Sequence, residues 1–179
     1  AKGVFSANLA DPRAGGEVAT GTLIAPYRLG VNHDHFFSYR IDFDIDGRAN
    51  QFVRHKLEAA SQPVGAPRGG IWQVNRQPVA DEQSAQTLMS VDRPALLTFE
   101  SASRTNAMGY PTSYQLMYPS IRPLVTLDDV TYQRARFLRN NLWVTRYQRD
   151  ELFSSGMLVN QSAASQGLPQ YISNNDALD

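Results

Sequence analysis

No cysteine occurs among the 179 residues, so the chain has no disulfide, no thiolate metal site and no cysteine nucleophile. Charge of one sign is not in excess either, because 17 Lys and Arg residues balance 17 Asp and Glu residues. Without net charge or a basic cluster interleaved with aromatic residues, nucleic acid is not an expected partner. No apolar run approaches the roughly 20 residues of a membrane-spanning helix. A membrane is therefore not an expected partner.

Histidine is also scarce, yet two of the three histidines lie one residue apart in NHDHFFSYRIDFDIDG, residues 32–47. If residues 33–45 form one strand, its period of two places His33 and His35 on the apolar, buried face, about 6.6 Å apart along the strand. Imidazoles at this spacing can share one metal ion such as copper, zinc, iron or nickel. Ordinary histidines bonded to carbonyl groups at a strand end are the alternative. These residues leave both interpretations open.

Two histidines do not complete a metal site, so a third ligand is required. His55 is the one remaining histidine, and it lies between charged neighbours in QFVRHKLEA. We interpret His55 as a solvated strand residue, with a role as the third ligand as the less favoured alternative. The completing ligand is then expected outside this chain.

Alternating aspartates follow the histidine pair and suggest a second kind of site. Asp42, Asp44 and Asp46 alternate, and the backbone carbonyl of Phe43 lies between the first two. Hard oxygen ligands of this kind suit Ca²⁺. The alternative is a solvated face on which Asp46 and Gly47 make a turn. The residues by themselves favour neither interpretation.

The rest of the chain alternates short β-rich runs with Gly, Pro, Asn and Asp, a pattern typical of an all-β, antiparallel β-sandwich. One short helix is predicted in DEQSAQTLM, with Asp81 as its N-cap. The polar tail from Ser154 onward reads as surface loop. The predicted strands are Gly21–Ala25, His33–Ile45, Gln51–Leu57, Ile71–Val79, Ala95–Glu100, Ser113–Tyr118, Ala135–Leu138 and Leu142–Tyr147.

Several motifs together resemble the catalytic domain of the copper- and topaquinone-dependent primary amine oxidases. The histidine pair and the aspartates match that family's His-x-His strand, which continues as Arg-x-Asp-x-Asp-x-Asp-Gly. KGV, GTLIAP, WQVN, LWVTRY, NQS and GLPQYISNNDALD match in consistent order over nearly the whole chain. Within the family, the chain is similar to the bacterial periplasmic enzymes that oxidise tyramine and phenylethylamine.

This resemblance implies that residues 1–179 are part of a single catalytic β-sandwich domain with at most one short helix. It implies a homodimeric parent enzyme, periplasmic or secreted, with a cytoplasmic location as the alternative. His33 and His35 match the first two copper ligands. One calcium site matches Asp42, the carbonyl of Phe43, and Asp44. A second calcium site would comprise Glu82, Tyr171, Asn174 and Asp176.

At that second calcium site, Asn174 and Asp176 depart from the Asp and Glu that the family usually has. Surface side chains are the alternative interpretation for Glu82 and Tyr171. The resemblance thus assigns metal ligands to this chain, but no catalytic residue.

The parent enzyme that the resemblance implies oxidises a primary amine with O₂ to aldehyde, ammonia and hydrogen peroxide. Topaquinone acts there as the electron sink beside copper. The Asn-Tyr-Asp/Glu motif that supplies the quinone does not occur in this sequence. The aspartate base and the third histidine are expected outside it as well. We therefore interpret the chain as an internal part of the catalytic domain that is inactive by itself.

Other classes of protein also fit parts of the pattern. The first is a non-catalytic metal-binding β-sandwich, which would bind copper or calcium without oxidising amines. The second is a calcium-stabilised recognition module, in which the histidine pair would be dispensable. A zinc or iron enzyme of the cupin kind fits less well, because LWVTRY is not expected there.

Overall fold

The computed structural model describes residues 2–6, 21–25, 27–33, 35–90, 94–117, 126 and 128–178, with only the backbone for residues 2–6. The chain divides into two compact units, Ala1–Tyr39 and Arg40–Asp179, which we describe separately. The assignment of the whole chain to a single catalytic domain stays a prediction. No helix among the described residues has the length and apolarity needed to cross a bilayer.

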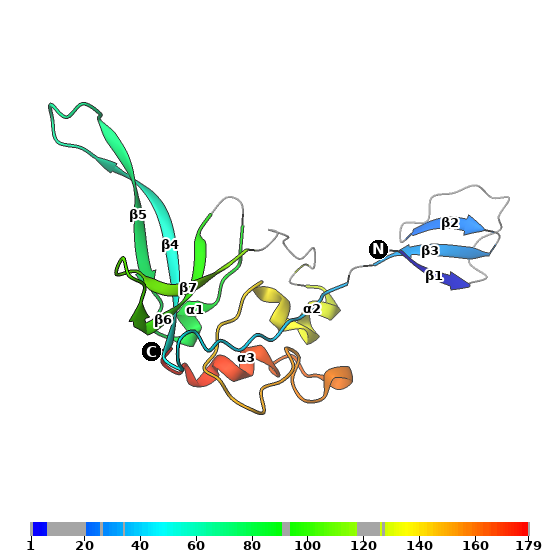
Figure 1. Ribbon diagram of the computed structural model, residues 1–179. Coiled ribbons are helices and arrows are strands. Elements are labelled where there is room, and N and C mark those ends of the chain that lie inside the picture. The colour runs from blue at the N-terminus through cyan, green and yellow to red at the C-terminus, as the bar shows by residue number, and fades with distance from the viewer. Residues whose placement is uncertain are drawn as a thin grey trace. The chain divides into compact units, whose positions relative to one another are not determined.

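The first unit contains a three-stranded antiparallel sheet in the order β1-β3-β2 (Figure 1). Its strands are β1 (Lys2–Ser6), β2 (Gly21–Ala25) and β3 (Arg28–Asn32), so the predicted strand at Gly21–Ala25 is confirmed. A Cβ atom on Gly21 would collide with the carbonyl oxygen of Gly30. A residue without a side chain therefore allows β2 and β3 to pair at this point.

The second unit contains a four-stranded antiparallel sheet in the order β5-β4-β6-β7. Figure 1 shows β4 and β5 as a long hairpin. Three predicted strands are confirmed, namely Gln51–Leu57, Ile71–Val79 and Ala95–Glu100, and the first and third are longer than predicted. The predicted strand Ser113–Tyr118 is shifted and ends at Leu116. Tyr118 lies outside the described residues. The observed strands are β4 (Asn50–Ser61), β5 (Gly70–Pro78), β6 (Leu96–Thr105) and β7 (Pro111–Leu116).

One face of this second sheet carries the hydrophobic core. Phe52 on β4 and Phe99 on β6 are paired in register, and both are buried. The ring of Phe43 stacks on Phe99 with 4.2 Å between the ring centroids, and Ile45 is buried in the same cluster. The segment that follows the histidine pair is therefore anchored to the core at Phe43 and Ile45.

The predicted helix at residues 81–89 is confirmed as α1 (Glu82–Ala85). Asp81 caps it by accepting a 2.8 Å hydrogen bond from the backbone N–H of Ser84. The described residues contain further short helices, so the prediction of at most one was too low. The all-β, antiparallel class is nevertheless confirmed, because every one of these helices is short. The others are α2 (Val130–Arg134), α3 (Leu168–Tyr171) and the 3₁₀ helices Arg136–Arg139, Val159–Gln161 and Ile172–Asn174.

The predicted long strand His33–Ile45 is wrong. Its described residues belong to no strand, and a bend begins at Ile45. The predicted buried face is also wrong over its first half, since Phe37 is 78% exposed and Tyr39 is 82% exposed. Alternation shows which side chains share a side of an extended chain, but not whether another strand pairs with it.

Two further strand predictions are wrong, as is the prediction of a loop from Ser154 onward. The segment Ala135–Leu138 is the N-cap and first three residues of a 3₁₀ helix, and Leu142–Tyr147 forms no strand beyond a single bridge from Leu142 to Thr87. The tail contains α3 and buries Ile172. Packing against the rest of the second unit thus outweighed the local composition.

Candidate metal sites

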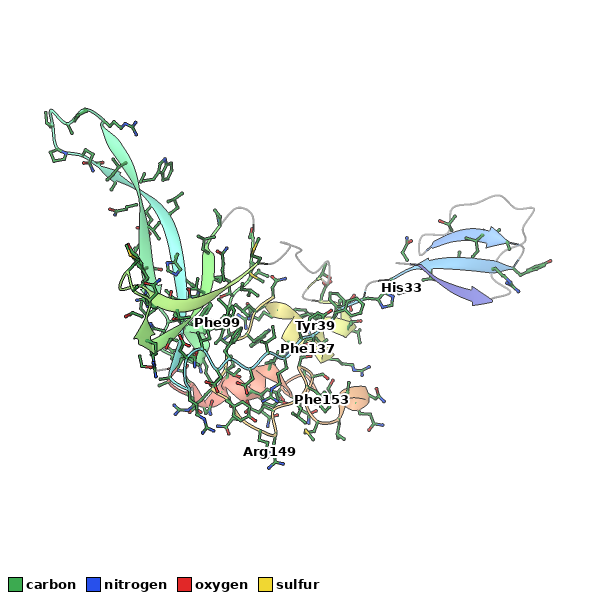
Figure 2. All side chains as sticks on the ribbon, viewed as in Figure 1. His33, Tyr39, Phe99, Phe137, Arg149 and Phe153 are labelled. Carbon is green, nitrogen blue, oxygen red and sulfur yellow. The ribbon has the colours of Figure 1, made fainter. Side chains whose placement is uncertain are left out.

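The two predicted copper ligands lie directly after β3, and their rings face each other. The Nε2 atoms of His33 and His35 are 2.9 Å apart, with the rings in an edge-on arrangement. The ring of His35 also stacks on Phe37. Figure 2 labels His33 at the end of this strand. His33 is only partly buried and His35 is exposed, so the predicted burial of the pair is wrong even though the rings converge.

The geometry of this pair fits two ligands of one metal ion. Two nitrogen atoms at about 2.0–2.1 Å from an ion, with an angle of about 90° between them, are about 2.9 Å apart. The Nδ1 atom of His33 lies 3.2 Å from the carbonyl oxygen of Val31. A carbonyl oxygen can only accept, so this contact turns the Nδ1 side of the His33 ring toward the backbone and the Nε2 side toward His35. His33 is thereby oriented and prepared for a metal ion.

No third ligand joins this pair, because the residues that the structure describes contain no metal-competent group of three His, Cys, Asp or Glu side chains. The expectation that the third copper ligand lies outside this chain stays a prediction. His55 belongs to a different network in the four-stranded sheet. Its Nε2 atom lies 2.8 Å from Thr98 Oγ1 and 3.2 Å from Glu100 Oε1. The interpretation of His55 as a solvated residue is wrong, since its side chain is only 19% exposed.

Glu100 is the centre of that network, and sequence reasoning missed it. Its side chain is 5% exposed, and Arg76 NH2 donates a 2.6 Å hydrogen bond to its Oε2 atom. Burial acts to raise the pKa of Glu100, but the hydrogen bonds from Arg76, Thr98 and His55 outweigh it and hold that pKa below the ordinary value. The alternation of β6, which places Thr98 and Glu100 on one face, was the available signal.

The residues of the first predicted calcium site lie where the chain enters the core. Because the ring of Phe43 is turned inward against Phe99, its neighbours Asp42 and Asp44 lie exposed to solvent. The predicted turn follows at once, with Asp46 at φ 52° and Gly47 at φ 126°. Exposed carboxylates on either side of a backbone carbonyl have the chemistry of calcium ligands. The structure therefore leaves the carboxylates of Asp42 and Asp44 accessible to a cation.

The residues of the second predicted calcium site are used differently. Glu82 is 2% exposed, so its interpretation as a surface side chain is wrong. Its Oε1 and Oε2 atoms accept hydrogen bonds from the backbone N–H groups of Arg146 and Asp176, at 2.8 and 3.1 Å. The Tyr171 hydroxyl donates to the carbonyl oxygen of Phe153. The Glu82 carboxylate and the Tyr171 hydroxyl are thus engaged by backbone groups of the chain.

Glu151 is a further acidic residue near this cluster that sequence reasoning missed. Burial, followed by the negative charges of Glu82 and Asp176, raises the pKa of Glu151, while Arg40 opposes the shift. Arg40 also donates a 2.9 Å hydrogen bond to the carbonyl oxygen of Gln148. No sequence pattern pointed to Glu151, because its proximity to Glu82 depends on the tertiary fold.

Comparison with known proteins gives a family for this arrangement. The family model described as "Copper amine oxidase, enzyme domain" matches residues 1–179. The chain belongs to the copper amine oxidase family. Two curated relatives illustrate the match. A primary amine oxidase of Klebsiella aerogenes is 33% identical over 99% of this chain, and a histamine oxidase of Arthrobacter globiformis is 33% identical over 98%.

The chain spans about a quarter of the length of these relatives, 24% and 25% respectively. Solved structures agree on the fold. An Aspergillus nidulans amine oxidase matches 76% of this chain and 19% of its own chain, with a TM-score of 0.64 and 19% sequence identity. The Pichia pastoris lysyl oxidase matches the same shares with a TM-score of 0.61 and 21% identity. The antiparallel β-fold of the chain is thus that of copper amine oxidases.

Proposed function

We propose that this chain supplies two copper ligands to a copper- and topaquinone-dependent primary amine oxidase, which converts primary amines and O₂ to aldehyde, ammonia and hydrogen peroxide. The observation that carries the proposal is the 2.9 Å separation of the His33 and His35 Nε2 atoms. Family membership supports it, because copper-containing amine oxidases are among the relatives. The amine is of the tyramine or phenylethylamine kind, as the bacterial resemblance implies.

Within this proposal, the chain's own residues hold and orient the metal. The contact of Nδ1 with the carbonyl of Val31 orients the His33 ring so that Nε2 faces the ion. The Nε2 atom of His35 lies 2.9 Å from that of His33, so both nitrogen atoms can face the same ion. The metal and quinone supply the electron transfer when bound. We further propose that the chain by itself does not turn over amines.

Copper titration of the purified chain tests the histidine pair. In the His33→Ala/His35→Ala variant we expect the copper affinity to fall at least about tenfold, because both nitrogen ligands are gone. His55→Ala is the matched control, because it also removes an imidazole but leaves the pair intact. Equal copper affinity in the double variant and the wild type would remove the basis of the proposal.

Turnover separates the oxidase from the alternative, a non-catalytic metal-binding β-sandwich. The parent polypeptide, loaded with copper, is expected to release hydrogen peroxide from tyramine. The same polypeptide carrying the double alanine change is expected to release none. Copper binding without peroxide release by the parent polypeptide would favour the non-catalytic module.

The remaining parts of the proposal concern calcium, assembly and location. We propose that Asp42, Asp44 and the carbonyl of Phe43 bind a peripheral calcium ion, since both carboxylates are exposed. A homodimeric parent is supported by large exposed apolar side chains on the β4–β5 hairpin, among them Leu57, Trp72 and Val74. A periplasmic or secreted location stays a prediction.

A further inference from the structure

Within the second unit, a short run of backbone hydrogen bonds joins the segment at residues 172–178 to residues 80–83. The backbone N–H of Glu82 donates to the Asp176 carbonyl at 3.1 Å, and that of Leu178 donates to the Ala80 carbonyl at 2.9 Å. Asp81 and Ala177 form an antiparallel bridge between these two bonds. Two hydrogen bonds are a small number for holding a chain segment, so further contacts are needed to fix its position.

The carboxylate of Glu82 supplies those contacts. Its two oxygens accept from the backbone N–H groups of Asp176 and Arg146, which are 30 residues apart in sequence. The guanidinium of Arg146 donates to the Ala177 carbonyl at 3.3 Å. Three chain segments therefore meet at one carboxylate that is 2% exposed. Hydrogen bonds to a charged acceptor are stronger than those between neutral groups, and more so when they are shielded from water.

The side chain of Asn175 adds a separate contact between the same segments. Its Oδ1 atom accepts a 2.9 Å hydrogen bond from the backbone N–H of Gln83, and its backbone is left-handed, with φ 54°. Asparagine tolerates this conformation better than most residues with a side chain. The Gln83 side chain donates in turn to the Ile172 carbonyl. Side-chain and backbone hydrogen bonds therefore both join residues 172–178 to residues 80–83.

From this geometry we infer that Glu82 is a hydrogen-bonded tie that positions residues 172–178 without a calcium ion. Ca²⁺ requires six to eight oxygen atoms at about 2.3–2.6 Å that are turned toward one point. Both Glu82 oxygens already accept backbone N–H groups, and the Tyr171 hydroxyl donates to Phe153. Asn174 also brings no negative charge where the family has an aspartate. Hydrogen bonds here replace the ion that the family resemblance implies, and this inference does not depend on the proposed amine oxidation.

Thermal unfolding in calcium and in chelator tests this inference. The experiment uses the Asp42→Asn/Asp44→Asn background, so that the other proposed calcium site does not contribute. In that background we expect the same melting temperature in calcium chloride and in EGTA. Adding Glu82→Gln should lower it by about 4–8 °C in both conditions, because the new amide N–H₂ faces a backbone donor and one hydrogen bond is lost.

Asp176→Asn in the same background is the matched control, because the tie uses only the backbone of Asp176. We expect it to leave the melting temperature within about 2 °C and to leave residues 172–178 protected from amide hydrogen exchange. A calcium-dependent rise in melting temperature that Asp176→Asn abolishes would overturn the inference, because that side chain would then bind the ion. If Glu82→Gln does not fold, the calcium responses of the background and of Asp176→Asn still decide the question.

Discussion

Replacing Glu100 by Gln removes the negative charge at the centre of the network on β4, β5 and β6 while keeping the shape of the side chain. Arg76 loses a charged acceptor at 2.6 Å, and the groups of Thr98 and His55 at 2.8 and 3.2 Å then face an amide. Gln can place its oxygen toward Arg76 and its N–H₂ group toward Thr98. We therefore expect the sheet to form but to be less stable.

The magnitude follows from the exchange of one charged acceptor for a neutral one. A hydrogen bond to a charged group contributes about 1.5–3 kcal/mol and one between neutral groups about 1 kcal/mol. The Arg76 side chain is 40% exposed, so water compensates part of the loss. We expect Glu100→Gln to lower the free energy of unfolding by about 1–2 kcal/mol at neutral pH. For a chain of this size this corresponds to about 3–6 °C in melting temperature.

The same reasoning predicts how the effect depends on pH. Because the pKa of Glu100 is lowered in the folded state, its ionised form stabilises the fold above the ordinary value of 4.5. This contribution is lost as the pH falls below 4.5 through the folded-state pKa. The difference in stability between wild type and Glu100→Gln should therefore begin to shrink below about pH 5 and should shrink further as the pH falls through the folded-state pKa.

Chemical denaturation of both proteins across this pH range is the assay. Glu58→Gln is the control, because Glu58 lies on β4 and accepts from Asn75, and no charged partner of its carboxylate is described. It should change the free energy of unfolding by less than about 0.5 kcal/mol at any pH. A difference for Glu100→Gln that stays constant between pH 7 and pH 3 would refute the assignment of the effect to the Glu100 charge.

Two further substitutions test packing in the two units. Phe43→Ala should lower the free energy of unfolding by about 2–4 kcal/mol, because it removes a ring stacked on Phe99 with 4.2 Å between the centroids. Denaturant titration measures this change, and a loss under about 0.5 kcal/mol would contradict the packing. Gly21→Ala should weaken the pairing of β2 with β3, because its Cβ atom would collide with the Gly30 carbonyl oxygen. Faster amide exchange in β2 and β3, with exchange in β4 unchanged, is the expected result. Unchanged exchange in all three strands would contradict the prediction, because the added methyl group would then be accommodated without weakening the pairing.

Local chemistry was sufficient to predict the parts of the fold that depend on neighbours in sequence. The strand at Gly21–Ala25 and the strands around Phe52 and Phe99 follow from β-rich runs between turn residues. The N-cap at Asp81 follows from an aspartate before a helix-favouring run, since its bond to Ser84 spans only three residues. Such features need no information about distant parts of the chain.

Features that depend on distant residues were mispredicted or missed. The segment from His35 to Ile41 has the alternation of a strand, but it belongs to no strand of the structure. Glu82 was assigned to a calcium site or to the surface, whereas its carboxylate meets backbone N–H groups from residues 146 and 176. Neither outcome leaves a signal in the local sequence, because the partners come from elsewhere in the chain.

The candidate copper ligands His33 and His35 depend both on their spacing in sequence and on the packing of the chain. That His33 and His35 can meet at one ion follows from their spacing, since side chains two apart in an extended chain lie on the same side. Whether the rings are buried, and what surrounds them, follows from chain packing, and here they lie at the surface of the residues described. Bond geometry acts between neighbours in sequence and can be read from residue order. Burial and charge pairing act between neighbours in space, so they become defined when the chain folds.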